Sequence, residues 1–195
     1  MQGVTERIAH TLKSIRKMRG WSLSHTAQHT GVSKAMLGQI ERGESSPTVA
    51  TLWKIASGMH VAFSAFLETQ GSTVAGDARR AETPVFLETG GGMRVESLFP
   101  YEPTLSFEMF IVDLIPAARS ESSPHANGVV EHVAVIEGVL ALTVDGGAHR
   151  LSSGQGIRFA ADCPHSYHNP GVERVRFHDL IHYPPWCERS PAWST

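Results

Sequence analysis

The spacing of apolar residues changes partway along this chain. From about Val4 to Met18, residues Ile8, Leu12 and Ile15 recur at the spacing that places side chains on one face of an α-helix. Beyond about Pro84, apolar and polar residues instead alternate in short runs, which is typical of β-strands with one buried face. The pattern therefore predicts a helical part followed by a β-rich part.

Capping residues and glycines divide the helical part into short segments. Ser22, Ser33 and Thr48 each precede a periodic apolar stretch, as N-cap residues do. Gly31 separates two of these segments, because glycine readily adopts the positive φ that a tight turn between crossing helices requires. These signals predict five short helices, over residues 4–18, 22–30, 34–42, 48–59 and 62–68.

The β-rich part consists of short runs separated by Gly, Pro, Asn and Asp. The runs that predict strands are residues 93–99, 105–114, 129–136, 139–147, 156–160 and 175–183. Asp145 and Gly146, near the end of the fourth of these runs, are a hairpin turn signal. Many short strands at close spacing favour a sandwich or a β-barrel of jelly-roll type.

The predicted fold class is thus a multidomain α plus β chain. We expect a helical domain over residues 1–70, a linker over 71–83 rich in small and polar residues, and a β domain with a C-terminal tail over 84–195. Cys163 and Cys187 are the two cysteines, too few for a disulfide framework, and both are expected to be free thiols.

The net charge of −2 hides a division between the two parts. Residues 1–70 hold eight Lys or Arg against four Asp or Glu, a net charge of +4, so the remaining residues carry −6. A basic helical domain is a candidate to bind a polyanion. No apolar run approaches the roughly 18 residues that a membrane helix needs, and no secretion signal opens the chain. We therefore expect a cytoplasmic protein with no membrane partner.

Residues 21–68 carry the motifs of a DNA-binding family. "GVS" (31–33), "IERG" (40–43) and "SPTVATLWKIA" (46–56) resemble the phage-repressor-like (XRE/Cro) helix-turn-helix family, whose DNA-binding domain is of the lambda-repressor type. The resemblance implies that the helix beginning at Lys34 enters the major groove of double-stranded DNA. The residues that it implies in DNA contact are Ser22, Ser33, Lys34, Ala35, Gly38, Gln39, Arg42, Ser46 and Thr48.

The chemistry of these side chains agrees with that role. Lys34 can donate to guanine, Gln39 can form a bidentate pair with adenine, and the Ala35 methyl group can touch thymine. Arg42 and the hydroxyl residues can bind phosphates. The family resemblance also implies that Val32, Leu37 and Ile40 are core residues and that Arg16 and Glu41 form a buried structural ion pair.

The β-rich part is similar to a cupin over roughly 100 residues. "SPHANGVVEHVAVIEG" (123–138) and "GQGIRFAADCPHSYHN" (154–169) match the two cupin motifs. The resemblance implies that His125, Glu131 and His165 are metal ligands, with a divalent ion such as Zn, Ni or Fe. Asn127 stands where the family has another histidine, and an amide is a poor ligand for Zn or Fe.

Other polar residues are candidates to complete the site or to bind a small molecule. Asn127 and Tyr167 are predicted ligand-binding residues, although Tyr167 can also be a core aromatic. His178 and His182 share one strand face about 13 Å apart, so at most one could replace the missing ligand. Instead of holding a metal, the same polar residues can hydrogen-bond a small molecule or one another.

A helix-turn-helix domain joined to a cupin resembles a family of one-component transcriptional regulators in which the cupin senses a metabolite. "GIRFAAD" (156–162) and "LIHYP" (180–184) are similar to the sulfur-utilisation regulator type, which makes a sulfur compound the expected effector. One reading helix per chain predicts a homodimer on a near-palindromic operator. Two alternatives stay open, namely a cupin metalloenzyme tethered to DNA, such as an iron dioxygenase or isomerase, and a purely architectural DNA binder.

Overall fold

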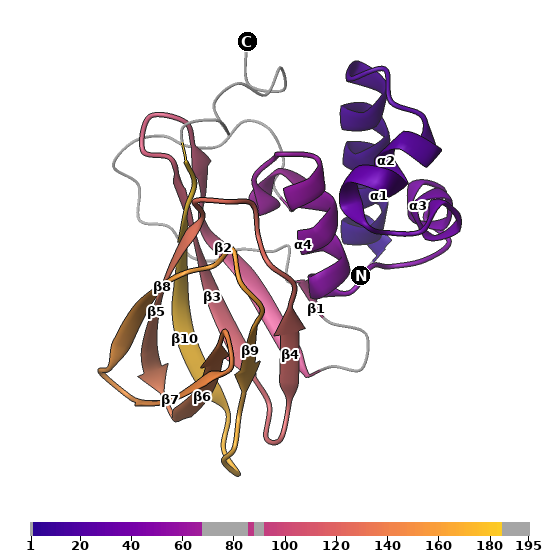
Figure 1. The fold of residues 1–195 in the computed structure, drawn as a ribbon. Coiled ribbons are helices and arrows are strands. Elements are labelled where there is room, and N and C mark those ends of the chain that lie inside the picture. Colours follow the sequence, from indigo (N-terminus) through magenta and orange to yellow (C-terminus); the bar gives the residue numbers. More distant parts are fainter. Residues whose placement is uncertain (1, 68–85, 88–91, 185–195) are drawn as a thin grey trace.

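The computed structural model of the chain describes residues 2–67, 86–87 and 92–184. A bundle of helices packs beside two β-sheets, and the last helix of the bundle lies next to the strands (Figure 1). The predicted linker over residues 71–83 and the tail from residue 185 onward lie outside the described residues. Within the described ranges, none of the helices has the length and apolar character needed to span a membrane.

The helices begin where the predicted capping residues stand. The helical elements are α1 (Gln2–Met18), α2 (Leu23–Thr30), α3 (Lys34–Glu41), α4 (Val49–Gly58) and the 3-10 helix η1 (Phe63–Phe66). The side-chain oxygens of Ser22, Ser33 and Thr48 accept hydrogen bonds from backbone N–H groups three residues later, at 3.1, 3.2 and 3.1 Å. The predicted fifth helix over residues 62–68 is present, within the described residues, only as the four-residue 3-10 helix η1.

The helical core combines predicted residues with one close backbone contact. Ile8, Leu12 and Ile15 of α1 are buried, as their spacing predicts. At Gly58, a Cβ atom would lie 2.4 Å from the carbonyl oxygen of His29. Glycine is therefore required where α4 crosses the end of α2, and the two helices pack with their backbones in near contact.

Ten strands form two sheets. The strands are β1 (Phe86–Leu87), β2 (Met93–Glu102), β3 (Phe107–Leu114), β4 (Arg119–Ser122), β5 (Val130–Glu137), β6 (Val139–Val144), β7 (Gly147–Ser152), β8 (Gly156–Ala160), β9 (His165–His168) and β10 (Val175–His182) among the described residues. One sheet has the order β1-β2-β3-β10-β5-β8 and the other has the order β4-β9-β6-β7. The described strands pair within these two sheets, so the strand pairing does not confirm closure into a barrel.

All six predicted strands are present, and the hairpin turn is confirmed. Asp145 and Gly146 both have positive φ, 46° and 79°, which suits a two-residue turn between β6 and β7. The sequence analysis missed β1, β4, β7 and β9. Of these, β4, β7 and β9 are rich in polar residues, so they lack the apolar alternation that marks a strand.

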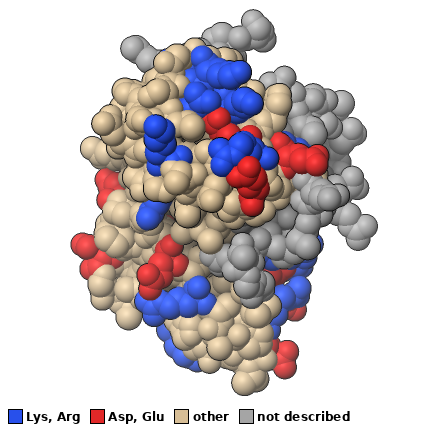
Figure 2. Space-filling view, turned by 90° about the vertical axis from the view of Figure 1, so that its right-hand side faces the viewer, with Lys and Arg blue, Asp and Glu red and all other residues tan. Residues whose placement is uncertain are grey.

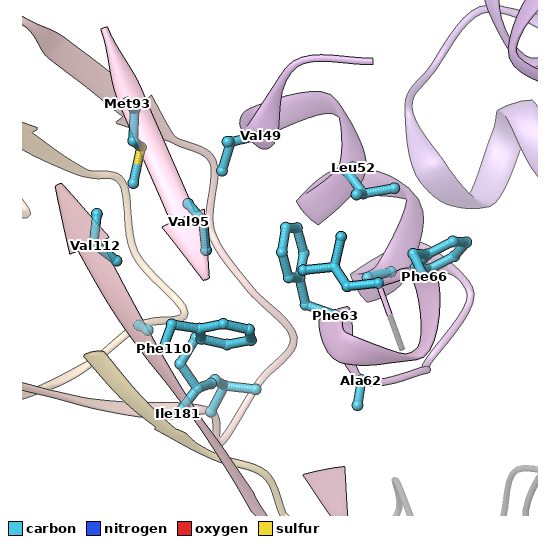
Figure 3. Packing of buried hydrophobic residues seen from close by; sticks show 14 of the residues in the cluster. Val49, Leu52, Ala62, Phe63, Phe66, Met93, Val95, Phe110, Val112 and Ile181 are labelled. Atoms are coloured by element: carbon cyan, nitrogen blue, oxygen red, sulfur yellow. The ribbon is translucent and has the colours of Figure 1, made fainter. Parts of the chain in front are cut away.

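One hydrophobic core runs from the helices into the larger sheet. Phe63 of η1 meets Phe110 of β3 edge-on, with ring centroids 5.5 Å apart and an interplanar angle of 88°. Figure 3 shows Phe63 between Leu52 of α4 and the strand residues Val95 and Phe110. Because Phe63 and Phe110 are fully buried, each stabilises the contact between the helices and the larger sheet by about 1.5–3 kcal/mol. This contact is called the joint below. The helical domain is therefore seated on the β domain by close packing.

Candidate functional site

The helices α2 and α3 are joined as the sequence predicts. Gly31 between them has φ 66°, and only three residues separate the two helices. Val32, Leu37 and Ile40 are buried, which confirms the predicted core face of this pair. The opposite face of α3 is left toward solvent.

Most of the predicted DNA-contact residues lie on that exposed surface or beside it. The exposed ones are Ser22, Ser33, Lys34, Ala35, Gln39, Arg42 and Ser46, whereas Thr48 is half-buried. Gly38 is buried instead of exposed, because the Arg42 side chain folds back over it. Met36, an exposed apolar residue on the same helix, was not singled out from the sequence.

Arg42 is held by a neighbouring acid. Its guanidinium donates to both carboxylate oxygens of Glu44, at 2.8 and 2.7 Å, and both side chains are exposed. Ser46 Oγ lies 2.8 Å from the hydroxyl oxygen of Thr5. Figure 2 shows Lys and Arg side chains gathered on the helical face of the molecule with acidic side chains among them. The surface is thus basic but locally neutralised at Arg42.

A buried ion pair ties α1 to α3. Arg16 donates to the two carboxylate oxygens of Glu41 at 2.5 and 2.8 Å, and it also donates to the backbone carbonyl of Trp21 at 2.9 Å. The two side chains are only 15% and 8% exposed. This contact confirms the predicted Arg16–Glu41 pair and leaves it a structural part of the bundle.

The three predicted metal ligands come together between the two sheets. Glu131 is on the inward face of β5, since Glu131, Val133 and Val135 are buried while His132 is exposed. His165 opens β9 of the other sheet, and His125 lies in the loop before β5. All three side chains are buried.

Their polar atoms converge on one carboxylate. His125 Nε2 lies 2.8 Å and His165 Nε2 lies 3.5 Å from Glu131 Oε1. The hydroxyl of Tyr167 donates to the other oxygen of Glu131. Tyr167 is itself buried and stacks on Phe177, so it is both a core aromatic and a partner of the candidate site.

The electrostatics of this group favour a charged carboxylate. Burial by itself raises the pKa of Glu131, but the neighbouring imidazoles of His125 and His165 outweigh burial and hold that pKa well below its usual range. Burial lowers the pKa of His165, yet the nearby Glu131 carboxylate raises it overall. The result is a charged carboxylate flanked by two imidazoles.

This donor set fits a divalent metal ion. One ligand atom from each of His125, Glu131 and His165 lies within 4.8 Å of the other two. His165 Nε2 is buried without a hydrogen-bond partner in the described part of the chain. Such an atom usually has a partner, and a metal ion bound through the nitrogen lone pair would supply one. Its Nδ1 lies 2.9 Å from the Cys163 carbonyl, which fixes the ring as partners of metal-bound histidines do. The group could therefore hold a metal.

The other predicted ligand-binding residues are not brought into this group. Asn127 is exposed in the turn before β5. On β10, the alternation of buried residues turns Phe177, Asp179 and Ile181 inward, which places His178 and His182 on the opposite face. Neither histidine therefore faces the group formed by His125, Glu131 and His165, and the question of which one could replace the missing ligand finds no candidate on the inward face of β10.

Asp179 is an inward-facing residue that the sequence analysis missed. It is buried, and its Oδ1 has no hydrogen-bond partner among the described residues. Burial raises the pKa of Asp179 well above its usual value, and the nearby charges of Glu131 and Glu108 raise it further. The strand alternation contained the signal, since Asp179 shares a face with two apolar residues.

Comparisons with known proteins match both halves of the chain. The helix-turn-helix family matches residues 12–66 and the cupin domain family matches residues 110–183. The HTH-type transcriptional regulator SutR of Escherichia coli K12 is 52% identical over 184 residues, covering 94% of this chain and 99% of SutR. PuuR, another HTH-type transcriptional regulator of that strain, is 23% identical over 84% of this chain and 89% of PuuR.

A crystal structure of an HTH_3 family transcriptional regulator from Vibrio cholerae has the same arrangement. It is 45% identical, covers 92% of this chain and 97% of its own, and superposes with a TM-score of 0.81. The fold and its two domains thus define a DNA-binding regulator class. The chain belongs to the family of HTH-type transcriptional regulators that join a helix-turn-helix domain to a cupin domain.

Proposed function

We propose that this protein is a cytoplasmic regulator that binds a near-palindromic operator as a homodimer and is controlled by a small molecule at its cupin domain. Its α3 helix enters the major groove, where Lys34, Ala35 and Gln39 meet base edges and Arg42 meets phosphate. The exposure of these four side chains beside a buried core face of α3 supports this assignment. Two reading helices in a dimer require half-sites about 34 Å apart.

The cupin domain acts in this proposal as a sensor and not as a catalyst. His125, Glu131 and His165 would hold Zn, Ni or Fe, and the ion would supply a Lewis-acid position for a sulfur or carboxylate group of the effector. A sulfur compound is the proposed effector because of the sequence motifs shared with the sulfur-utilisation type. The convergence of two imidazoles on the buried Glu131 is the observation that carries the metal proposal.

DNA binding is tested by selecting duplexes from a random library with the full-length protein at low salt, followed by footprinting. We expect a near-palindrome with half-sites one helical turn apart. Replacing Gln39 with Ala should cost about 1–3 kcal/mol at one base position, while Ala at the exposed Glu137 of the β domain should change nothing. Recovery of no preferred sequence, or of a single half-site bound by a monomer, would contradict the proposal.

The sensor is tested by thermal unfolding of chelator-stripped protein with Zn(II), Ni(II), Fe(II), thiosulfate and cysteine, singly and in pairs. A ligand at a hundredfold its Kd should add about 2.7 kcal/mol of stability. His125→Asn should abolish the metal effect, whereas His132→Asn, an exposed neighbour on β5, should keep it. If no metal stabilises the protein, the metal site is refuted. If the protein steadily consumes the sulfur compound, the cupin domain is an enzyme and not a sensor.

A further inference from the structure

A tryptophan of the DNA-binding domain touches one of the candidate metal ligands. Trp53 of α4 is half-buried, and its ring centroid lies 4.6 Å from the imidazole of His125 with an interplanar angle of 31°. The same indole stacks on Phe63, with ring centroids 4.3 Å apart and an angle of 18°. A helix of the DNA-binding domain is therefore in direct contact with the candidate metal site. The described helices of this domain, residues 2–67, are called the reading domain below.

His125 has little room to move without moving Trp53. Its side chain is 3% exposed, its Nε2 lies 2.8 Å from Glu131, and its backbone N–H donates to the Ala161 carbonyl at 2.9 Å. The ring of His165 meets it edge-on, with centroids 5.0 Å apart. Because the imidazole is closely packed among these neighbours and the indole, a shift of the imidazole has to change its contact with Trp53.

Binding a metal requires such a shift. His125 Nε2 and Glu131 Oε1 lie 2.8 Å apart, the separation of two hydrogen-bonded atoms. Two ligands bound at about 2.1 Å to one tetrahedral ion are about 3.4 Å apart. These two atoms therefore have to separate when an ion binds between them, and His125 is the ligand that contacts the reading domain.

A second contact fixes the joint beside Trp53. The Glu108 carboxylate of β3 accepts hydrogen bonds from the backbone N–H groups of Phe63 and Ser64 at 3.0 and 2.8 Å, which caps η1. The Ser64 hydroxyl accepts from the backbone N–H of Tyr101 on β2 at 2.9 Å. Because η1 is anchored to the sheet, Phe63 cannot slide away to absorb a displacement of Trp53.

The contact at Gly58 carries a displacement of α4 onward to the reading pair. A Cβ at this glycine would lie 2.4 Å from His29 O and 2.6 Å from Thr30 Cα, so the backbones of α4 and the end of α2 are in direct contact. The turn that leads into α3 begins at the next residue, Gly31. The chain of contacts thus runs from His125 through Trp53 and α4 to the helix that faces DNA.

We propose that Trp53 is the positioning residue that orients His125 and couples metal occupancy of the cupin site to DNA affinity. This inference rests on the proposed function of the site and adds its route of regulation. Couplings of this kind usually change an affinity by about 5- to 150-fold, and the change is reciprocal, so bound DNA should alter the metal Kd by the same factor.

The test measures the Kd of the selected operator duplex for full-length protein, stripped and saturated with Zn(II). In the wild type we expect the two Kd values to differ by at least about fivefold. Trp53→Leu should still bind Zn(II), but the ratio should fall toward 1, and Trp53→Phe should restore part of it. Trp21→Leu is the matched control, because Trp21 packs on His25 and His29 within the reading domain.

A ratio retained in Trp53→Leu, or a ratio of 1 in the wild type despite bound Zn(II), would overturn the coupling. Absence of Zn(II) binding in the wild type would overturn the metal site itself, and absence of operator binding both with and without Zn(II) would overturn the DNA proposal instead. A variant that fails to fold is bypassed by a protein whose other tryptophans, Trp21, Trp186 and Trp193, are Phe. Titration of this protein with Zn(II) should change the fluorescence of Trp53, and the change should be complete at one equivalent of Zn(II) per chain. Unchanged emission would also refute the coupling.

Discussion

Three acidic side chains face inward from the larger sheet, and each is compensated differently. Glu131 is matched by two imidazoles and the Tyr167 hydroxyl, so its pKa is lowered. Glu108 receives two backbone N–H groups and the Tyr183 hydroxyl, but its complete burial still raises its pKa. Asp179 has one oxygen without a hydrogen-bond partner among the described residues, and its pKa is raised. A buried carboxylate keeps its charge only where enough donors or cations surround it.

Removing the Glu131 carboxylate should destabilise the metal-free protein. Glu131→Ala leaves the buried Tyr167 hydroxyl and His125 Nε2 without their partner, and the expected loss is about 3 kcal/mol in the free energy of unfolding. Urea unfolding in the presence of chelator measures it. The control is Glu137→Ala on the same strand, whose exposed pair with Arg174 is worth less than about 1 kcal/mol. Equal losses in both variants would contradict the buried network.

The stability of the protein should fall in acid partly through Asp113. Burial raises the pKa of this group, but hydrogen bonds and charge from Arg176, with the charges of Arg174 and Arg94, outweigh burial and lower it. Its stabilising contribution is therefore present above the unfolded pKa of about 3.9 and is lost as pH falls through the lower folded value. Urea unfolding between neutral pH and acid should show Asp113→Asn less stable than wild type at pH 7.

The difference between Asp113→Asn and wild type should narrow as the solution is acidified. Glu121→Gln is a suitable comparison, since the Glu121 side chain is 75% exposed. This variant should track the wild type at every pH. A gap between wild type and Asp113→Asn that stays constant through the acid range would contradict the ion-pair explanation.

At the scale of elements, the sequence predicted the helix boundaries that are set by neighbouring residues. The three N-caps and Gly31 act within a few residues of their own positions, so the helix boundaries could be read from the sequence. The segment that became η1 is different, because its backbone is capped by Glu108, 45 residues away from Phe63. Its form depends on tertiary contacts that no local pattern contains.

The β10 strand shows why part of the site could not be predicted. One face of this strand carries Phe177, Asp179 and Ile181, and the other carries His178, Leu180 and His182. Because each face mixes apolar and polar residues, the signal for the inward face is a difference of one apolar residue, which is weak. By contrast, β5 carries Val133 and Val135 on the Glu131 face, so on that strand the pattern of apolar residues indicates the inward face clearly.

The α3 surface leads to a pair of opposite expectations for DNA binding. Arg42 is engaged by Glu44, so Glu44→Gln should free a cation and remove an anion beside the phosphates. Operator affinity should then rise several-fold at low salt, while Arg42→Ala should weaken binding and reduce the salt slope by about 1. Fluorescence anisotropy over a salt series measures both. Weaker binding by Glu44→Gln would show that Arg42 needs this acid for its orientation.

At the scale of the whole molecule, we expect the packing of η1 and α4 on the larger sheet to make the two domains unfold together. Phe63→Ala should cost about 3–5 kcal/mol, because the ring fills the space between Trp53, Leu52 and Phe110. Far-UV circular dichroism and tryptophan fluorescence should give one urea midpoint in the wild type and separate midpoints in the variant. Phe99→Ala, at a 43% exposed position on β2, is the control and should keep a single transition. A single midpoint for Phe63→Ala would contradict the coupled core.

The anchoring of η1 also orders events during synthesis. Phe63 bonds to Glu108, 45 residues later, and its N–H lies 3.5 Å from the Tyr183 hydroxyl, 120 residues later. When α1 to α4 leave the ribosome, neither partner has yet been made, although N-terminal domains begin to fold as they emerge. The helical domain therefore acquires its final turn only after the cupin domain has been translated. A nascent chain cannot hold η1 in its finished place before the strands that anchor it exist.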